Sequence, residues 1–187
     1  MSPSLRTQLG FWLYLMTDCM LFASLFAVYA VSQTATANLP GPKDLFELPL
    51  VMLETGLLLL SSFTCGLALV MASRGKINHL LGFLVATFIL GIAFLFVELH
   101  EFQTLISEGY DWGASAFLSS FFVLVGTHGL HIFIGLIWLL VLIVLLLRKG
   151  LSENIQHKLK LFSLFWHFLD LVWIFIFTIV YLGGVAI

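Results

Sequence analysis

Charge is what this sequence has least of. Only 10% of its 187 residues are Asp, Glu, Lys or Arg, and 61% are hydrophobic. An average soluble domain carries about 25% charged residues. The net charge of −2 provides no basic surface for binding nucleic acid. The composition therefore excludes an ordinary soluble domain and indicates an integral membrane protein with a single domain, residues 1–187.

Cysteine and glycine-rich loops are also scarce. Cys19 and Cys65 both stand in apolar runs, and neither has a partner at the spacing of a zinc or redox site. We expect both to be small buried thiols. No glycine-rich phosphate-binding loop is present. These absences leave no motif for zinc, disulfide or nucleotide chemistry.

Long apolar segments are what the sequence has most of. A run of about 20 apolar residues crosses a bilayer as a helix. Five such runs predict an all-α integral membrane bundle, and they cover residues 11–31, 48–72, 80–98, 117–147 and 161–182. The fourth run is longer than a straight crossing requires, so we expect it to tilt or to begin outside the lipid.

Positive charge gathers on one side of the predicted spans. The segment before the first span and the loops after the second and fourth spans carry Arg6, Arg74, Lys76, Arg148, Lys149, Lys158 and Lys160. The other side has only Lys43. The positive-inside rule then predicts a cytoplasmic N-terminus and a periplasmic C-terminus. The candidates for contact with lipid headgroups are Arg74, Lys76, Arg148 and Lys149.

Ionisable residues inside the spans are the candidate functional positions, because they are costly at membrane depth. They are Asp18, Glu54, Glu98, His128, His131, His167 and Asp170. No Lys or Arg lies within any span, so the acids have no fixed cation beside them. We expect the acids to be neutral and hydrogen-bonded, or to face a wet or headgroup-lined cleft.

Depth along the runs predicts an inner cluster. Asp18, His167 and Asp170 fall roughly 9–14 Å from the cytoplasmic ends of their runs, at 1.5 Å per residue. Tyr14 stands four residues before Asp18, so its hydroxyl can reach that carboxyl. We expect these four side chains to meet where the first and fifth spans pack, and either to brace the bundle or to handle protons.

The remaining ionisable residues predict a second cluster, from the outer half to the middle. Glu54 begins the second span and Glu98 ends the third, while His128 and His131 lie nearer the middle. Packing, proton or lipid handling, and metal or haem ligation remain open for both clusters. A haem between spans needs one histidine from each of two helices at similar depth. Only His131 with His167 approaches this, and their depths differ by roughly a turn or more.

Five segments resemble subunit III of haem–copper respiratory oxidases. They are residues 11–19 FWLYLMTDC, 47–55 ELPLVMLET, 96–102 FVELHEF, 125–138 VGTHGLHIFIGLIW and 163–182 SLFWHFLDLVWIFIFTIVYL. The resemblance runs from about residue 10 to 182 and is strongest to the bacterial cytochrome o ubiquinol oxidase branch. Asp18 matches a membrane carboxyl in the first helix shared by the family, which is Asp in the quinol branch.

The resemblance implies a role that the residues alone do not. The assembled enzyme of this family oxidises ubiquinol, reduces oxygen to water and pumps protons in the bacterial inner membrane, with its haems and copper in subunit I. Subunit III carries no cofactor of its own. It packs beside subunit I, shares the complex with subunits II and IV, and holds phospholipid in a cleft. Cytochrome c oxidase relatives have two more helices before the matched region.

Two functions of different classes remain to be compared. The resemblance favours a non-catalytic subunit of a proton-pumping ubiquinol oxidase, which is part of an oxidoreductase but has no redox centre. The alternative is a small haem-b anchor, or a stand-alone proton-conducting protein, built on the chain's own His and Asp residues. A Soret band from the isolated polypeptide would favour the alternative.

Overall fold

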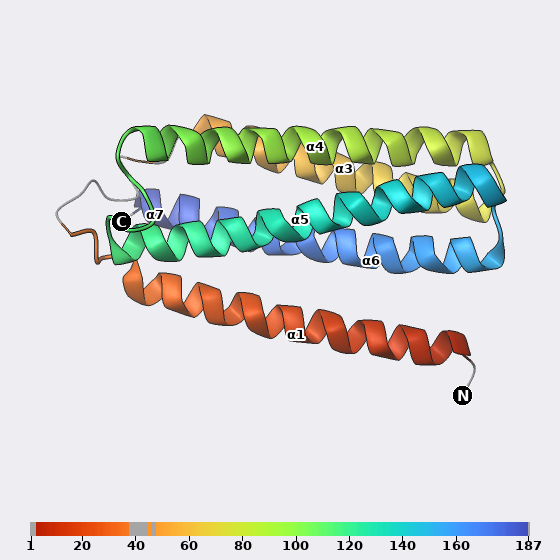
Figure 1. Ribbon diagram of the computed structural model, residues 1–187, viewed down its shortest axis with the longest axis horizontal. Helices are drawn as coiled ribbons and strands as arrows, with labels where there is room; N and C mark the ends of the chain where they lie inside the picture. Colours follow the sequence, from red (N-terminus) through yellow and green to blue (C-terminus); the bar gives the residue numbers. More distant parts are fainter. Residues whose placement is uncertain (1–2, 38–44, 46–47, 187) are drawn as a thin grey trace.

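The computed structural model describes residues 3–37, 45 and 48–186. All regular elements in these ranges are helical, and five helices are long and apolar enough to cross a membrane. They are α1 (Pro3–Ser32), α3 (Leu48–Ser73), α4 (Ile77–Ser107), α5 (Ala116–Lys149) and α6 (Glu153–Ile176), and α6 continues as the π-helix η1 (Phe177–Leu182) and the short α7 (Gly183–Ala186). The helices run lengthwise beside one another (Figure 1). The predicted all-α bundle of five spans is confirmed.

The helices extend past the apolar runs that predict them. α4 continues to Ser107, beyond the predicted end at residue 98, and α6 begins at Glu153, before the predicted start at residue 161. A bilayer core needs only about 20 helical residues, so the polar ends of these helices reach past the lipid. His167 and Asp170 lie near the middle of the helical segment Glu153–Leu182.

Local chemistry sets the helix ends. The Ser115 hydroxyl accepts a hydrogen bond from the Leu118 N–H at 3.1 Å at the start of α5, and Ser152 accepts one from the Ile155 N–H at 3.4 Å at the start of α6. Both are serine N-caps, which satisfy N–H groups that lack a partner within the helix. α5 ends at Gly150 with φ of 68°, a left-handed conformation that glycine adopts at little cost. A short polar link can therefore turn the chain between α5 and α6.

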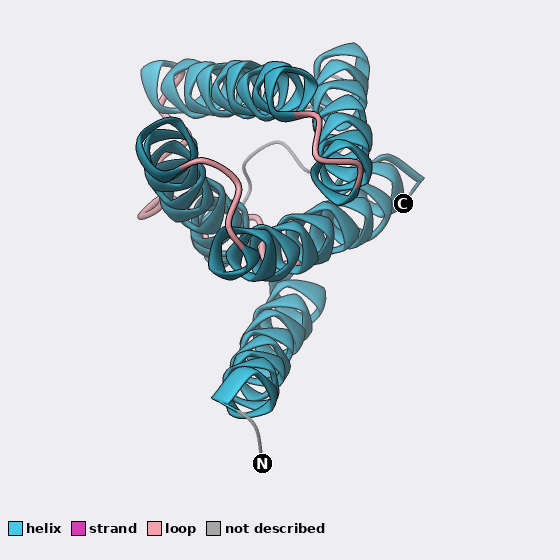
Figure 2. Cartoon of the chain, turned by 90° about the vertical axis from the view of Figure 1, so that its right-hand side faces the viewer, coloured by secondary structure: helices cyan, strands magenta, loops and turns pink. Residues whose placement is uncertain are grey.

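Four helices form the body of the bundle, and α1 lies beside it. α3 packs along α4 and α6, and α5 packs against α4 and α6. α1 reaches this body mainly through α5 and to a smaller extent through α6. Figure 2 shows α1 projecting away from the other helices. The buried side chains of α1 form a narrow stripe, made of Leu15, Asp18, Phe22 and Tyr29.

The narrow stripe on α1 also explains an error in the sequence prediction. Cys65 of α3 is buried as expected, but Cys19 of α1 is exposed. Cys19 follows Asp18 directly and so lies off the face that meets α5. The expectation of two buried thiols is therefore wrong for Cys19.

The basic segments lie together at one end of the bundle. The start of α1, the turn between α3 and α4, and the turn between α5 and α6 share the right-hand end of Figure 1. The headgroup candidates at this end are all exposed: Arg74, Lys76, Arg148 and Lys149. Lys43, expected on the opposite side, lies outside the described residues. The fold thus groups the charges on which the predicted orientation depends, and the orientation itself stays a prediction.

Trp166 of α6 is central to the core, with only 1% of its surface exposed. Its indole N–H donates to the Ser61 hydroxyl of α3 at 3.0 Å. Its ring lies against Gly91 of α4 and Gly135 of α5, where a Cβ atom would come 3.0 Å from the ring. Glycine allows these helices to approach closely, as small residues do in membrane bundles. One tryptophan therefore joins four helices.

Candidate functional site

The structure divides the predicted inner cluster between two helix interfaces. The Asp18 Oδ2 atom lies 3.7 Å from Nε2 of His131 on α5. His167 instead places Nδ1 2.5 Å from the Ser62 hydroxyl of α3, and Asp170 lines the same surface notch as Ser62 and His167. The expected meeting of Asp18 with His167 and Asp170 is thus corrected, because α6 turns these two side chains toward α3 rather than toward α1. Depth alone does not reveal which way a helix faces.

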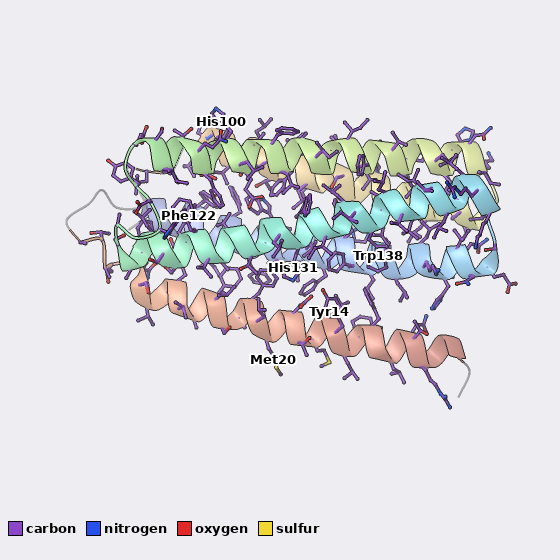
Figure 3. The ribbon with its side chains drawn as sticks, viewed as in Figure 1. Tyr14, Met20, His100, Phe122, His131 and Trp138 are labelled. Carbon is purple, nitrogen blue, oxygen red and sulfur yellow. The ribbon has the colours of Figure 1, made fainter. Side chains whose placement is uncertain are left out.

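The first of these groups joins α1 to α5. His131 Nδ1 lies 2.7 Å from the Thr127 carbonyl oxygen and must donate to it, since a carbonyl has no proton to give. Nε2 is therefore left to face Asp18, whose Oδ2 atom is buried and has no hydrogen-bond partner within the described residues. Tyr14 lies within interaction range of Asp18, as its position one turn earlier on α1 predicts. Figure 3 shows Tyr14 and His131 between α1 and α5, while Met20 points away from the bundle.

Asp18→Leu is expected to loosen α1 from the bundle. The substitution removes the carboxyl group that lies 3.7 Å from His131, and losing a buried polar contact costs about 1–3 kcal/mol. Asp18→Asn keeps much of the shape and hydrogen bonding, so it should retain most of the stability. The measurement is the fraction of chain that stays folded in detergent on heating. Cys19→Leu, at the exposed neighbouring position, is the control. Equal losses for Asp18→Leu and Cys19→Leu would show that the contact contributes nothing.

The second group lies at the interface of α3 and α6. Ser62, His167 and Asp170 line a surface notch of about 440 Å³. The Asp170 Oδ1 atom is shielded and has no hydrogen-bond partner among the described residues. His167 is exposed, although it lies near the middle of its span. The sequence singled out His167 and Asp170 but missed Ser62, whose only signal was a small polar side chain in an apolar run.

A third group, at the other end of the bundle, contains three glutamates. Tyr181 of η1 donates its hydroxyl to Oε2 of Glu101 at 2.9 Å. Glu54 and Glu98, both buried, lie within charge-interaction range of Glu101. Like charges close to one another repel, so the three carboxyls influence one another. Sequence reasoning placed Glu54 and Glu98 in the outer half but assigned neither Glu101 nor Tyr181 to a cluster. Glu101 could have been assigned from its i, i+3 spacing to Glu98, which places both carboxyls on one face of α4.

His128 belongs to none of these three polar groups. It is fully buried, with its ring 5.3 Å from Trp173, 6.0 Å from Phe94 and 6.3 Å from Phe22 between centroids. Neither of its ring nitrogens has a hydrogen-bond partner among the described residues. His128 is thus enclosed by aromatic rings and His131 faces Asp18. The second cluster is corrected accordingly, with Glu101 and Tyr181 beside Glu54 and Glu98 in place of the two histidines.

The histidines do not fit the haem alternative. His131 faces Asp18 at the α1/α5 interface, and His167 contacts Ser62 at the α3/α6 interface. The only two histidines considered as axial haem ligands therefore point into different interfaces. His128 is enclosed by rings. Within the described parts of the chain, no three His, Cys, Asp or Glu side chains are grouped to hold a metal ion. The arrangement instead provides hydrogen bonds and polar contacts between helices.

The fold and its intramembrane polar groups define a multi-pass helical membrane protein. The chain matches the family described as cytochrome c oxidase subunit III over residues 4–185, and it belongs to that family. The family resemblance carried by the five sequence motifs is thereby confirmed.

Individual relatives match over nearly the whole chain. The cytochrome bo(3) ubiquinol oxidase subunit 3 of Pseudomonas aeruginosa is 54% identical over 179 residues, which cover 96% of this chain and 86% of that one. Its counterpart in Pseudomonas putida is 51% identical with the same coverage. The quinol oxidase subunit 3 of Bacillus spizizenii is 46% identical over 95% of this chain and 87% of that one. With its five apolar helices, the chain is a multi-pass protein of the bacterial inner membrane.

Proposed function

We propose that this chain is the non-catalytic subunit III of a proton-pumping ubiquinol oxidase, a complex that oxidises ubiquinol and reduces oxygen to water. The observation that carries the proposal is the 54% identity, over 96% of the chain, to a relative named as subunit 3 of a cytochrome bo(3) ubiquinol oxidase. Haems and copper belong to subunit I in this proposal, and subunits II and IV complete the complex. The chain itself transfers no electrons.

The role of the chain within the complex is to stabilise subunit I and to bind phospholipid. Large apolar side chains are exposed along the spans, including Met20, Phe96 and Leu147, and they require lipid or another subunit as cover. The exposed arginines and lysines at one end of the bundle suit anionic headgroups: Arg74, Lys76, Arg148 and Lys149. The Asp18–His131 contact adds a polar link between α1 and α5.

Co-purification tests the proposed function. A tagged chain taken from native membranes is expected to bring subunits I, II and IV with it, identified by mass spectrometry, together with haem that belongs to subunit I. Deleting subunit I should leave the chain poorly accumulated, because its exposed apolar surface then lacks a partner. A chain that accumulates normally alone and shows its own Soret band would support the haem-anchor alternative instead.

The orientation is a further expected outcome. The charge asymmetry predicts a cytoplasmic N-terminus and a periplasmic C-terminus. Reporter fusions at Ser152, in the turn before α6, should therefore behave as cytoplasmic, and fusions after Ile187 as external. The reverse pattern of reporter activity would overturn the assignment.

A further inference from the structure

The last helix of the bundle changes its pitch before it ends. After Ile176, α6 continues as the π-helix η1, Phe177–Leu182, which leads directly into α7. π-helices are rare, and single π turns within α-helices are frequent at functional sites. The C-terminal ends of α1 and α4 share the left-hand end of Figure 1 with α7, opposite the basic turns. η1 therefore lies at the end of the bundle where α1 and α4 also end.

The wide turn of η1 sets the direction of Tyr181. Each residue of an α-helix rotates the chain by about 100°, so eight α-helical residues would carry Tyr181 about 80° past the face of Trp173. A π-helix closes its hydrogen bonds one residue further along, so each residue rotates the chain by less. The smaller rotation keeps Tyr181 on the side of Trp173, and the two ring centroids lie 6.2 Å apart. η1 thus directs a fully buried tyrosine into the bundle.

Two consecutive residues of η1 are held by different helices. The Tyr181 hydroxyl donates to Oε2 of Glu101 on α4 at 2.9 Å. The Val180 carbonyl accepts a hydrogen bond from the hydroxyl of Tyr29 on α1 at 3.4 Å. Both tyrosines and Val180 are 0% exposed, and a buried tyrosine hydroxyl usually requires a partner. Both hydrogen bonds therefore oppose any rotation of η1.

The two hydrogen bonds also share one rigid group. The Val180 carbonyl and the backbone nitrogen of Tyr181 belong to the same peptide unit, which is planar. If the carbonyl turns away from Tyr29, the backbone that carries the Tyr181 side chain must turn with it. A change at α1 is thereby passed to the contact with Glu101 without any direct contact between Tyr29 and Glu101.

We propose that η1 is a conformational link through which displacement of α1 alters the hydrogen bond between Tyr181 and Glu101. α1 is suited to such movement, because it buries only a narrow stripe and reaches the body of the bundle mainly through α5. The link is reciprocal, as every thermodynamic coupling is, so loss of either hydrogen bond weakens the other. The inference does not depend on the proposed function.

Hydrogen–deuterium exchange of backbone amides, read by mass spectrometry, tests the link. The sample is the tagged protein purified from native membranes together with the subunits that accompany it. Tyr29→Phe removes a hydroxyl on α1 and is expected to speed exchange about 2- to 12-fold in residues 101–107 of α4, the equivalent of one hydrogen bond. Tyr181→Phe should speed exchange by a similar factor in residues 26–32 of α1. If neither variant changes exchange on the far side of η1, the proposal is overturned.

Two hydroxyl deletions serve as matched controls. Tyr14→Phe removes a hydroxyl from α1 at a half-exposed position, remote in sequence from Tyr29, and should leave exchange in residues 101–107 unchanged. Thr178→Val removes a hydroxyl of η1 that donates to the Ile174 carbonyl within its own helix, and should leave exchange in residues 26–32 unchanged. Controls that speed exchange as much as the test variants would show general loosening of the bundle and contradict the link.

The double variant Tyr29→Phe with Tyr181→Phe distinguishes one link from two independent contacts. If both hydroxyls act through η1, exchange in each segment should be no faster than in the single variant that affects that segment more. Fold-increases that multiply in the double variant would mean that the two hydrogen bonds act separately. That result would overturn the proposal even if each single variant loosens its own helix.

Discussion

Trp166→Ala is expected to cost the bundle about 3–5 kcal/mol, the range for removing a large buried aromatic side chain. The indole occupies the space that Gly91 and Gly135 leave open, and it donates to Ser61. Removing it creates a cavity where α3, α4, α5 and α6 meet and leaves the Ser61 hydroxyl without this donor. The chain should then aggregate at a lower temperature in detergent and accumulate poorly in membranes.

Two further variants separate the contributions of Trp166. Trp166→Phe keeps much of the ring but loses the N–H, so it should lie between wild type and Trp166→Ala. Leu171→Ala, at an exposed position of the same helix, controls for truncation of an apolar side chain and should change little. If Leu171→Ala and Trp166→Ala lower the aggregation temperature equally, Trp166 does not join the helices in the way described.

Gly129→Ala is the second substitution with a large expected effect. A Cβ at this position of α5 would lie 2.6 Å from both carboxyl oxygens of Glu98 on α4, closer than atoms can approach. Because Glu98 is buried, either α4 and α5 must separate or the Glu98 carboxyl must move within its packed surroundings. Overpacking of this kind costs about 1–3 kcal/mol. Thermal stability of the purified complex is the measurement.

Gly126→Ala and a double variant make this prediction specific. Gly126 lies on the same helix, but a Cβ there meets Phe102 at an ordinary 3.7 Å, so the substitution should be tolerated. Glu98→Ala removes the group that causes the clash. The double variant Gly129→Ala with Glu98→Ala should therefore be more stable than the sum of the two single losses implies. Strict additivity of the two losses would show that Gly129 and Glu98 do not touch.

The contacts between the polar residues could not be predicted from the sequence, although the residues themselves could be recognised. Asp18, His131, His167 and Asp170 could be recognised from sequence because an ionisable residue in a long apolar run is conspicuous. Their depth could be approximated from position along the run. Their partners could not, since one residue rotates the side chain direction by about 100° and the rotation of each helix depends on its neighbours. Asp18 consequently faces His131 rather than Asp170.

Residues with ordinary side chains were harder to find. Nothing in the apolar sequence around them distinguishes Ser62, Tyr181 or Trp166. Each nevertheless donates or accepts a hydrogen bond between helices. The sequence likewise does not indicate which glycines lie at close helix contacts. Gly129 and Gly135 matter because of the bulky group on the facing helix, and that group is remote in sequence.

The sequence by itself determined that the chain crosses a membrane five times as helices, because hydrocarbon cannot satisfy backbone N–H and C=O groups and about 20 apolar residues are needed for each crossing. Its motifs also determined the family. Only the tertiary structure decided which polar residues meet, which face of α1 is buried, and that His167 and Asp170 reach the surface of the bundle beside Ser62. These features depend on how glycines, tryptophans and phenylalanines from different helices fit together. That fit joins residues more than a hundred positions apart, such as Ser61 and Trp166, and no local pattern encodes it.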